Sequence, residues 1–530
     1  MKSSVLKNYI IFIQFINFLL SMDGNYINPI ISGAHPDPSI CRVGDDFYIV
    51  NSSFEYFPGL PIHHSKDLVN WELIGHGLHR EDQCNGDMNL VDVQSDGGIH
   101  APTIRFNKGT FYIITTNVYN SGDGEPGLMR NFIITAKEPT GPWSKPHIID
   151  GAPGIDPDIF FDTDGKVYFT GTHNPGDMNS NGIGEIWIQE LDIKKWKLKG
   201  ERKTVWDGVF GCCTEGPHIY KEHGLYYLLV AEGGTGKNHA VMMAASENIY
   251  GPYEENPRNP VLTTRHVTND YFVNSTGHAD MIKLPDKRWY MVSLGKRNDL
   301  DGDANMGRET YLVPMTWEPT IVKWQQVSDT KWEPVRYLFP VASPHTGKVE
   351  RYETLPFENK IQYIDNSFID NFTSSELDLE WTFIRVPQSN TLSLQSKPGS
   401  LRLFSKPGII EDRKRFSMIG FRQRESDFEY EVKMNFLPED DKVESGIIHY
   451  QKEWNYLTNT IFKENKIFYL EHKLKEKGKS EKSLKRILLK GYEDNITFKV
   501  ESKKDIYTYY FSLDDGATFS YFNSINAVKM

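Results

Sequence analysis

A short pattern recurs five times in the first 290 residues and constrains the fold more than any other feature of the chain. Each copy ends in an aromatic run around a tyrosine, and consecutive tyrosines are 56 to 64 residues apart. These tyrosines are Tyr48, Tyr112, Tyr168, Tyr227 and Tyr290. Repetition at a fixed period means that one supersecondary unit is used several times. Because the runs read as short strands between turns, the pattern predicts an all-β fold with five blades, a five-bladed β-propeller.

A second aromatic signal follows the tyrosine run in every copy and predicts a turn followed by an outer strand. The residues that carry it are Trp71, Trp143, Trp196, Tyr253 and Trp324. The spacing leaves room for about four strands in each unit.

The start of each copy is polar, and it precedes an isoleucine that lies eight or nine residues before the tyrosine. The five starts are Asp37-Pro38, His100-Ala101-Pro102, Asp156-Pro157, Glu215-Gly216-Pro217 and His278-Ala279-Asp280. Propeller blades bring equivalent positions together around a central axis. We therefore expect three carboxyl groups and two histidines to converge, and paired carboxyl groups are the makeup of a glycosidase active site.

Asp37 lies between Pro36 and Pro38, which restrict the backbone on both sides of it. A carboxylate held in this way is suited to activating a water molecule. Asp156 occupies the same register relative to proline and isoleucine in the third copy. Asp158 is a competing candidate, because strand alternation places residues 156 and 158 on the same face. The register favours Asp156.

Glu215 is offset by one residue from the two aspartates and is followed by Gly216, which allows close backbone approach. A carboxyl group kept protonated by neighbouring negative charge is what a general acid needs. His278 has three candidate roles: to orient a carboxylate, to contact sugar or to ligate a central cation. The alternative for His278 is a buried, hydrogen-bonded histidine without a role in chemistry.

The charge balance limits the partners of this chain. The 530 residues carry a net charge of −12, without a basic patch over the repeats. This argues against nucleic acid and anionic membrane surfaces as partners and is compatible with a neutral polysaccharide.

The ends of the chain differ from the repeats. In residues 1–24, Lys2 and Lys7 precede an apolar run from Tyr9 to Leu20, which predicts a signal peptide and a secreted protein. The repeats predict a propeller over 25–340, and 341–364 reads as a linker. Alternating segments with frequent turn signals in 365–530 predict an antiparallel β-sandwich. The chain ends at Met530, soon after the last hairpin signal, from which a truncated sandwich is expected.

Several motifs of the repeats occur together in one known family. HPDPSICRVGDDFYIVNSSFEYFPGLPIHHSKDLVNW, IDPDIFFDTDGKVYF, TEGPHIYK, TGHADMI and GRETYLVP resemble glycoside hydrolase family 43, in particular its β-xylosidases and α-L-arabinofuranosidases. The resemblance runs through residues 27–340. The 365–522 region resembles the accessory β-sandwich, of concanavalin A-like or jelly-roll type, that these enzymes carry.

The resemblance implies a role for each candidate residue. It makes Asp37 the general base, Glu215 the general acid and Asp156 an ionised carboxylate that raises the pKa of Glu215 and orients it. Phe54 matches an aromatic residue of the pocket floor and Arg308 a sugar-contacting arginine. His278 matches a central histidine near which some members bind a structural calcium ion, although no cofactor is required. The implied activity is exo-acting, inverting hydrolysis of terminal β-D-xylosyl or α-L-arabinofuranosyl units in xylo-oligosaccharides or arabinoxylan.

Two departures and two alternatives accompany this interpretation. Many relatives carry an aromatic residue where His100 stands, and GVFGCCT over 208–214 replaces the usual approach to the acid. One alternative is a non-catalytic carbohydrate-binding propeller, which loss of any of the three acids would favour. The other is a fructan-acting five-bladed hydrolase, whose WMNDPNG-like motif HPDPSI does not match.

Overall fold

The computed structural model describes residues 10–13, 24–119, 128–177, 182–210, 212–298, 305–358, 360–438, 440–441 and 443–527. The described residues divide into two compact units, one over 24–363 and one over 364–527 together with 10–13. Most of the predicted signal peptide, 1–24, lies outside the described residues. Ile10–Ile13 form a strand, β1, within the second unit.

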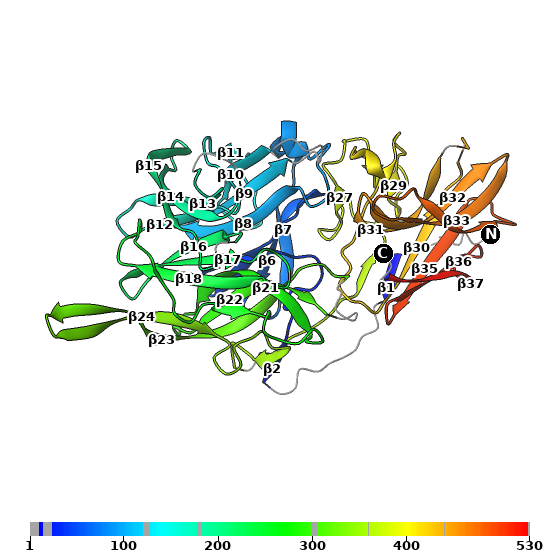
Figure 1. Cartoon of the computed structure of the whole chain (residues 1–530). Helices are drawn as coiled ribbons and strands as arrows, with labels where there is room; N and C mark the ends of the chain where they lie inside the picture. Colours follow the sequence, from blue (N-terminus) through cyan, green and yellow to red (C-terminus); the bar gives the residue numbers. More distant parts are fainter. Residues whose placement is uncertain are drawn as a thin grey trace. The chain divides into compact units, whose positions relative to one another are not determined.

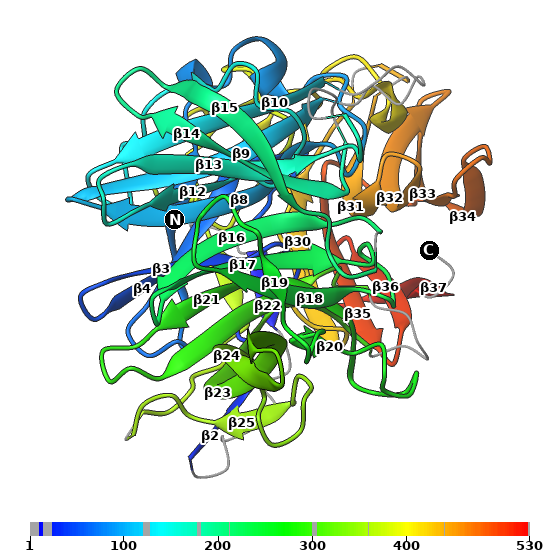
Figure 2. The same cartoon turned by 60° about the vertical axis from the view of Figure 1, so that its left-hand side comes forward.

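Five antiparallel sheets follow one another along the first unit (Figures 1 and 2). The first holds β3 (Ser39–Val43), β4 (Asp46–Val50), β6 (Gly59–Ser65) and β7 (Glu72–Leu78), and the second β8 (Gly98–Asn107), β9 (Thr110–Tyr119), β10 (Leu128–Ala136) and β11 (His147–Ile148). The third holds β12 (Asp158–Phe161), β13 (Val167–His173), β14 (Glu185–Asp192) and β15 (Lys197–Trp206). The fourth holds β16 (Glu215–Glu222), β17 (Leu225–Glu232), β18 (Ala240–Ser246), β19 (Glu254–Glu255) and the short β20 (Leu262–Thr263). The fifth holds β21 (Val273–Lys283), β22 (Trp289–Arg297), β23 (Glu309–Ser328) and β24 (Lys331–Ala342).

The innermost strands of the five sheets form a closed ring. Strand β3 packs beside β8, β8 beside β12, β12 beside β16, β16 beside β21, and β21 returns to β3. Figure 2 shows the sheets β12 to β15, β16 to β19 and β21 to β24 lying next to one another in chain order. The first unit is therefore a β-propeller, as the repeats predicted.

The aromatic signals of the sequence fall at equivalent places in this propeller. The five repeat tyrosines lie on the second strands β4, β9, β13, β17 and β22. Trp71, Trp196 and Tyr253 immediately precede the outer strands β7, β15 and β19, as the turn signals predicted, whereas Trp324 lies inside β23.

Shorter elements complete the first unit. Two 3-10 helices, η1 (Glu81–Gln83) and η2 (Gly86–Asn89), and the short strand β5 (Tyr56–Phe57) lie in loops. Strand β2 (Asn25–Ile27) pairs with β25 (Tyr352–Thr354). The stretch 341–364, predicted as a linker, thus contains a paired strand, and its residues up to Tyr363 belong to the first unit.

The second unit is built from two antiparallel sheets. One contains β26 (Phe368–Asp370), β1, β30 (Phe428–Asn435), β35 (Asn495–Lys503), β36 (Ile506–Ser512) and β37 (Ser520–Asn526). The other contains β31 (Glu444–Lys452), β32 (Asn455–Glu464), β33 (Ile467–Lys475) and β34 (Lys482–Leu488). Strands β27 (Phe383–Ile384), β28 (Leu392–Ser393) and β29 (Arg402–Leu403) and the 3-10 helix η3 (Ile410–Asp412) lie in its connections. Tyr430 and Val500 from the first sheet share a core with Ile447 and Leu470 from the second, which is the packing of a sandwich.

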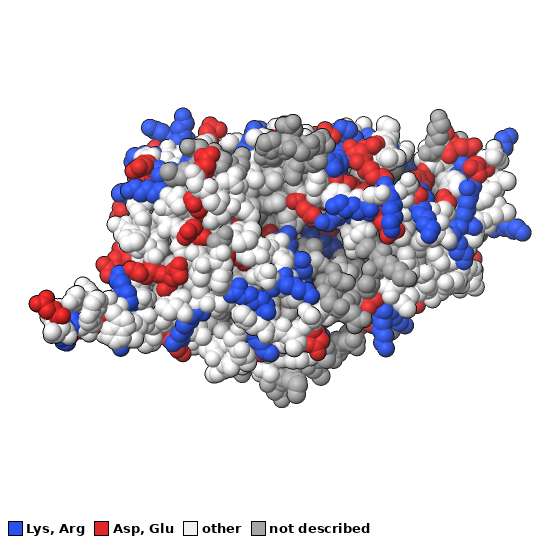
Figure 3. Space-filling model, viewed as in Figure 1, with Lys and Arg blue, Asp and Glu red and all other residues white. Residues whose placement is uncertain are grey.

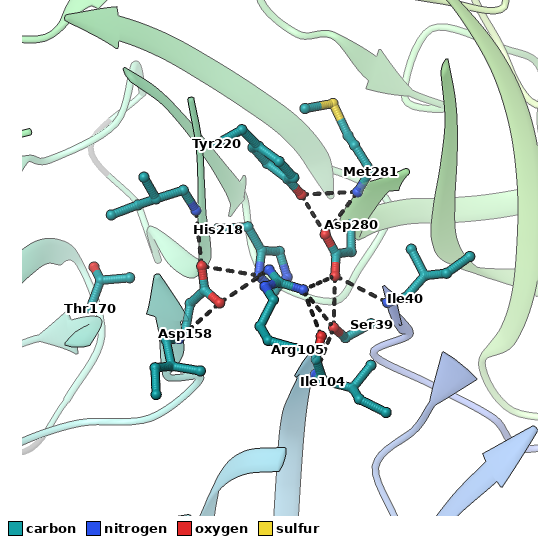
Figure 4. A network of polar contacts seen from close by, with 12 residues as sticks. Ser39, Ile40, Ile104, Arg105, Asp158, Thr170, His218, Tyr220, Asp280 and Met281 are labelled. Atoms are coloured by element: carbon teal, nitrogen blue, oxygen red, sulfur yellow. Dashed lines mark hydrogen bonds and ion pairs between the residues drawn. The ribbon is translucent and has the colours of Figure 1, made fainter. Parts of the chain in front are cut away.

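Charged side chains join the inner strands at the propeller axis (Figure 4). The Arg105 guanidinium lies 2.7 Å from the carboxylate of Asp280 and 3.1 Å from that of Asp158. It also lies 3.1 Å from Nδ1 of His218, while the Ser39 hydroxyl donates to Asp280 over 2.7 Å. Burial by itself lowers the pKa of Arg105, but the two carboxylates raise it above its ordinary value, so this cation is permanent.

Within the described residues, no helix is long and apolar enough to span a membrane.

Removing the positive charge at the axis should destabilise the propeller. In Arg105→Met, the fully buried carboxylates of Asp158 and Asp280 would lose their cation, and we expect a loss of about 3–5 kcal/mol in the free energy of unfolding. Lys199→Met is the matched control, because Lys199 makes an exposed pair with Glu190 and its replacement should leave the free energy of unfolding nearly unchanged. Denaturant unfolding of both variants measures this, and equal losses would contradict a structural role for the network.

Candidate active site

One backbone feature recurs where each inner strand begins or bulges. Five residues adopt a left-handed conformation, with φ between 33° and 59°: Asp37, Ala101, Asp156, Gly216 and His278. In β8, β16 and β21 this residue lies within a register shift of the strand. A non-glycine residue in this region costs about 1–3 kcal/mol and persists only where the surroundings hold it. The equivalence that the repeats predicted is therefore a shared backbone geometry.

Asp37 is buried and engaged by three side chains. Its Oδ2 accepts a hydrogen bond of 2.6 Å from the Ser52 hydroxyl, and its Oδ1 lies 3.1 Å from Arg308 and 3.5 Å from Nδ1 of His278. Burial alone raises the pKa of Asp37, but the charge of Arg308 and these other partners lower it below its ordinary value. Asp37 is accordingly a carboxylate throughout the neutral range.

Hydrogen bonds connect the loop before Asp37 to the start of strand β23, which directly follows Arg308. The amide of His35 donates to the carbonyl of Arg308 over 2.9 Å. Glu309, which is fully buried, pairs with Arg297 over 2.6 Å and accepts a hydrogen bond from the amide of Gly33. These bonds fix the position of Arg308 relative to Asp37.

Asp156 and Glu215 are two further buried carboxyl groups. In contrast to Asp37, the pKa of each is raised above its ordinary value. Burial raises the pKa of Glu215 to about 7, and the negative charge of Asp37 contributes in the same direction. Burial also raises the pKa of Asp156 well above its ordinary value, with further increases from Glu215 and Asp37. Neighbouring negative charges disfavour further ionisation, so these carboxyl groups do not titrate independently of one another. That Asp156 stays ionised and raises the pKa of Glu215 remains a prediction of the family resemblance, and the burial of Asp156 opposes it.

His278 lies between the carboxylate of Asp37 and the backbone of the fourth inner strand. A Cβ atom added at Gly216 would meet Nε2 of His278 at 2.8 Å, so only glycine lets the ring approach this strand. Burial lowers the pKa of His278 to about 4, which leaves the imidazole neutral at pH 7. The neutral ring can therefore accept or donate a hydrogen bond without placing a second positive charge beside the carboxylate of Asp37.

Phe54 and Arg308 pack against each other beside Asp37. The Arg308 guanidinium lies 5.1 Å from the centre of the Phe54 ring. His100 meets the same ring edge to face, with a centroid distance of 5.0 Å. The departure at His100 thus retains a flat ring at this wall, and burial lowers the pKa of His100 to about 4.

Two further residues belong to this site, and the repeat register did not indicate them. Ser52 binds Asp37 and also accepts a hydrogen bond of 2.7 Å from the amide of Ala101, linking two sheets. His239 is fully buried with its ring against Gly277, and its Nε2 has no hydrogen-bond partner among the described residues. The histidine of GGTGKNHA was the available signal for His239, but it lies outside the repeated pattern.

Asp158 and the cysteines have other roles. Asp158 accepts hydrogen bonds from the amides of Ile159 and Ile219 in addition to its contact with Arg105, so it belongs to the axial network. The sulfur atoms of Cys212 and Cys213 lie 2.9 Å apart, and all four cysteines, each within the described residues, are free thiols.

The described part of the chain contains no cluster of three or more His, Cys, Asp or Glu side chains arranged to hold a metal ion. Around His278, Asp37 is the carboxylate in contact with the ring, and Arg308 and Ser52 already engage it. These side chains do not supply the six to eight oxygen ligands that calcium takes. A calcium ion near His278 stays a prediction of the family resemblance.

The propeller and its buried carboxyl groups define a class of protein, the glycosidases that act through paired acids. The chain matches the family model "Glycosyl hydrolases family 43" over residues 26–320 and "Beta xylosidase C-terminal Concanavalin A-like domain" over 369–530. It belongs to glycoside hydrolase family 43, as the motifs indicated. Members of this family need no cofactor.

Relatives and solved structures agree with this assignment. The chain is 40% identical to "Xylosidase/arabinosidase" of Butyrivibrio fibrisolvens over 82% of this chain and 80% of that protein. It is 38% identical to "Non-reducing end alpha-L-arabinofuranosidase BoGH43B" of Bacteroides ovatus, over 85% of this chain and 78% of that protein. The crystal structure of xylan beta-1,4-xylosidase from Bacillus halodurans C-125 superposes with a TM-score of 0.84 at 29% identity, covering 95% and 92% of the two chains. The protein is therefore a glycosidase.

A side chain at Gly216 should disturb the site through His278. Gly216→Ala would place Cβ against the His278 ring, and a displacement of catalytic groups by about 1 Å can cost 10²-fold in rate. Gly224→Ala is the matched control, because Gly224 is also left-handed, at φ 80°, but has no atom within 4 Å of an added Cβ. We expect kcat/KM to fall about 10²-fold in the first variant only, and equal activities would contradict the close packing of His278.

Proposed function

We propose that this protein is an exo-acting, inverting glycosidase that releases terminal β-D-xylosyl or α-L-arabinofuranosyl units from xylo-oligosaccharides or arabinoxylan. The observation that carries the proposal is the opposite tuning of two carboxyl groups in one site, where Asp37 has a lowered pKa and Glu215 one of about 7. Relatives named as xylosidases and arabinofuranosidases support the choice of pentoses. We take each of the five sheets as one blade of a five-bladed propeller.

In the proposed reaction, the two carboxyl groups act on opposite sides of the sugar. Asp37 accepts a proton from a water molecule as the water oxygen attacks the anomeric carbon. Glu215 donates its proton to the departing glycosidic oxygen as the carbon–oxygen bond breaks. An inverting pair of this kind has its carboxyl groups about 6.5–9.5 Å apart, which leaves room for the water. Asp156 takes the role that the family resemblance implies, which is to orient Glu215 and tune its pKa.

The remaining residues would bind and orient the terminal sugar. Phe54 offers a ring to an apolar sugar face. Arg308 donates to sugar hydroxyls while it keeps Asp37 ionised. His278 and His239, both neutral at pH 7 because burial lowers their pKa values to about 4, provide uncharged hydrogen-bonding groups.

The two alternatives are less well supported. A carbohydrate-binding propeller without catalysis needs no pair of carboxyl groups with opposed pKa values. A fructan-acting enzyme would carry its nucleophile in a WMNDPNG-like motif, and the corresponding segment here is HPDPSI.

The pH dependence and the acid variant test the assignment of Glu215. The base form of Asp37 is lost as the pH falls through its lowered pKa, and the proton of Glu215 is lost as the pH rises through about 7. We expect a plateau of kcat/KM in acid that declines near pH 7. In Glu215→Gln the decline should disappear, and turnover should fall about 10²–10⁴-fold, most for poor leaving groups.

Glu55→Gln is the matched control for this experiment. Burial raises the pKa of Glu55 to about 7 as well, but the neighbours that bond to its carboxyl group are Ser95 and Asp96 rather than any of the three acids. The control should keep the alkaline decline. Two outcomes would show that Glu215 is not the acid. One is that the alkaline decline of kcat/KM disappears in Glu55→Gln, and the other is that turnover in Glu215→Gln falls equally for good and poor leaving groups.

Product stereochemistry and paired substrates test the reaction and its substrate class. Because Asp37 acts through water, proton NMR during early hydrolysis should show a first product of inverted anomeric configuration. We expect turnover of p-nitrophenyl β-xyloside, p-nitrophenyl α-arabinofuranoside or both. Retained configuration, or a glycosyl-enzyme trapped at Asp37, would overturn the mechanism, and inactivity on both substrates would overturn the substrate class.

A further inference from the structure

Two strands of the last propeller sheet extend beyond the rest of that sheet. Strand β22 pairs with β23 only from Glu309 to Met315, whereas β23 and β24 remain paired out to Ser328 and Lys331. Residues 316–341 therefore form a two-stranded ribbon, which we call the arm, and it projects from the propeller in Figure 1. An isolated two-stranded ribbon is marginally stable in water.

The base of the arm is held firmly. Phe339 is fully buried in a core cluster that Trp317 and Val322 also contact. Glu318 pairs with Arg258 over 2.7 Å, and Lys323 pairs with Glu254. The outer part of the arm is thus presented in a defined direction.

One face of the outer arm is aromatic and uncharged. Trp324 is paired with Pro334 and Gln326 with Trp332, so these four side chains share a face. The two tryptophans are 57% and 56% exposed and occupy diagonal positions, within reach of one binding partner. Interfaces between proteins are rich in aromatic residues and poor in charge at their centres.

The arm also differs in charge from the chain that carries it. Residues 316–341 contain three acidic side chains (Glu318, Asp329, Glu333) and three basic ones (Lys323, Lys331, Arg336), whereas the chain as a whole carries −12. Figure 3 shows the arm as mostly uncharged surface with both signs present near its end. Two copies of the chain can approach through this segment without the repulsion of their net charges.

We propose that the arm is the contact through which two copies of this chain associate. A two-fold contact uses the same surface on both copies and therefore needs a self-complementary patch, and the neutral arm with its uncharged face is one. Trp324 and Trp332 are the side chains expected to carry most of the binding energy.

The test measures the mass of the full-length protein in solution by size-exclusion chromatography with light scattering. We expect the wild type at micromolar concentration to have twice the mass of one chain. Trp324→Ser/Trp332→Ser should raise the dissociation constant of the dimer at least about 100-fold. Tyr363→Ser/Tyr521→Ser is the control, because these aromatic residues are 77% and 57% exposed elsewhere, and it should remain dimeric. A monomeric wild type, or a serine variant that dimerises as well as the wild type, would overturn the proposal.

A second variant and a second readout distinguish a dimer contact from a polysaccharide-binding surface. Gln326→Glu changes the same face without removing a ring and should also weaken the dimer, because it introduces a charge on the uncharged face that the contact would bury. Hydrolysis of a p-nitrophenyl glycoside should stay unchanged in both arm variants, which shows that they are folded. Loss of retention on insoluble arabinoxylan without a change in mass would show a polysaccharide-binding arm and overturn the proposal of a dimer contact.

Discussion

The site depends on a single backbone constraint, the left-handed residue at the point where each inner strand begins or bulges. This residue interrupts the alternation of the strand, so side chains on its two sides serve different purposes. In the third sheet Asp156 joins the acid pair, while Asp158, two residues on, binds the axial Arg105. His278 and Asp280 divide in the same way in the fifth sheet. The unfavourable conformation is tolerated because hydrogen bonds and packing on both sides hold it.

The chemistry of the site comes from three carboxyl groups whose charges are mutually dependent. Arg308 acts on both members of the catalytic pair, and it lowers the pKa of Asp37 and of Glu215 alike. The charged form of Asp37 is stabilised directly, because its carboxylate contacts the guanidinium and accepts a hydrogen bond from the Ser52 hydroxyl. The ionised Asp37 then raises the pKa of Glu215. The contact with Arg308 thus keeps Asp37 as the base against its own burial, and the negative charge that it stabilises adds to the burial that raises the pKa of Glu215.

The repeats predicted the propeller, the second strands and the three acids, because a fixed period with polar starts is visible in a single sequence. Ordinary alternation puts Asp156 and Asp158 on one face, so only the repeat register favoured Asp156. The left-handed kink that separates the two residues is not encoded by a recognisable residue type. Ser52, Arg105 and His239 were not singled out because their partners come from other sheets. Trp324 was predicted on an outer strand, and the extension of that strand into an arm depends on β22 ending first.

The axial network also supports the strands that carry the acids. Arg105, Asp158, His218 and Asp280 come from four inner strands and meet at the centre of the ring, and the two aspartates are fully buried. These residues follow the left-handed positions by two to four residues, so the network lies next to the acids along the axis. Charge-assisted hydrogen bonds are roughly twice as strong as neutral ones, so this network joins four of the five inner strands directly beside the positions that carry the acids. The left-handed residues are thus held in place from the axial side by ionic contacts that the repeats themselves bring together.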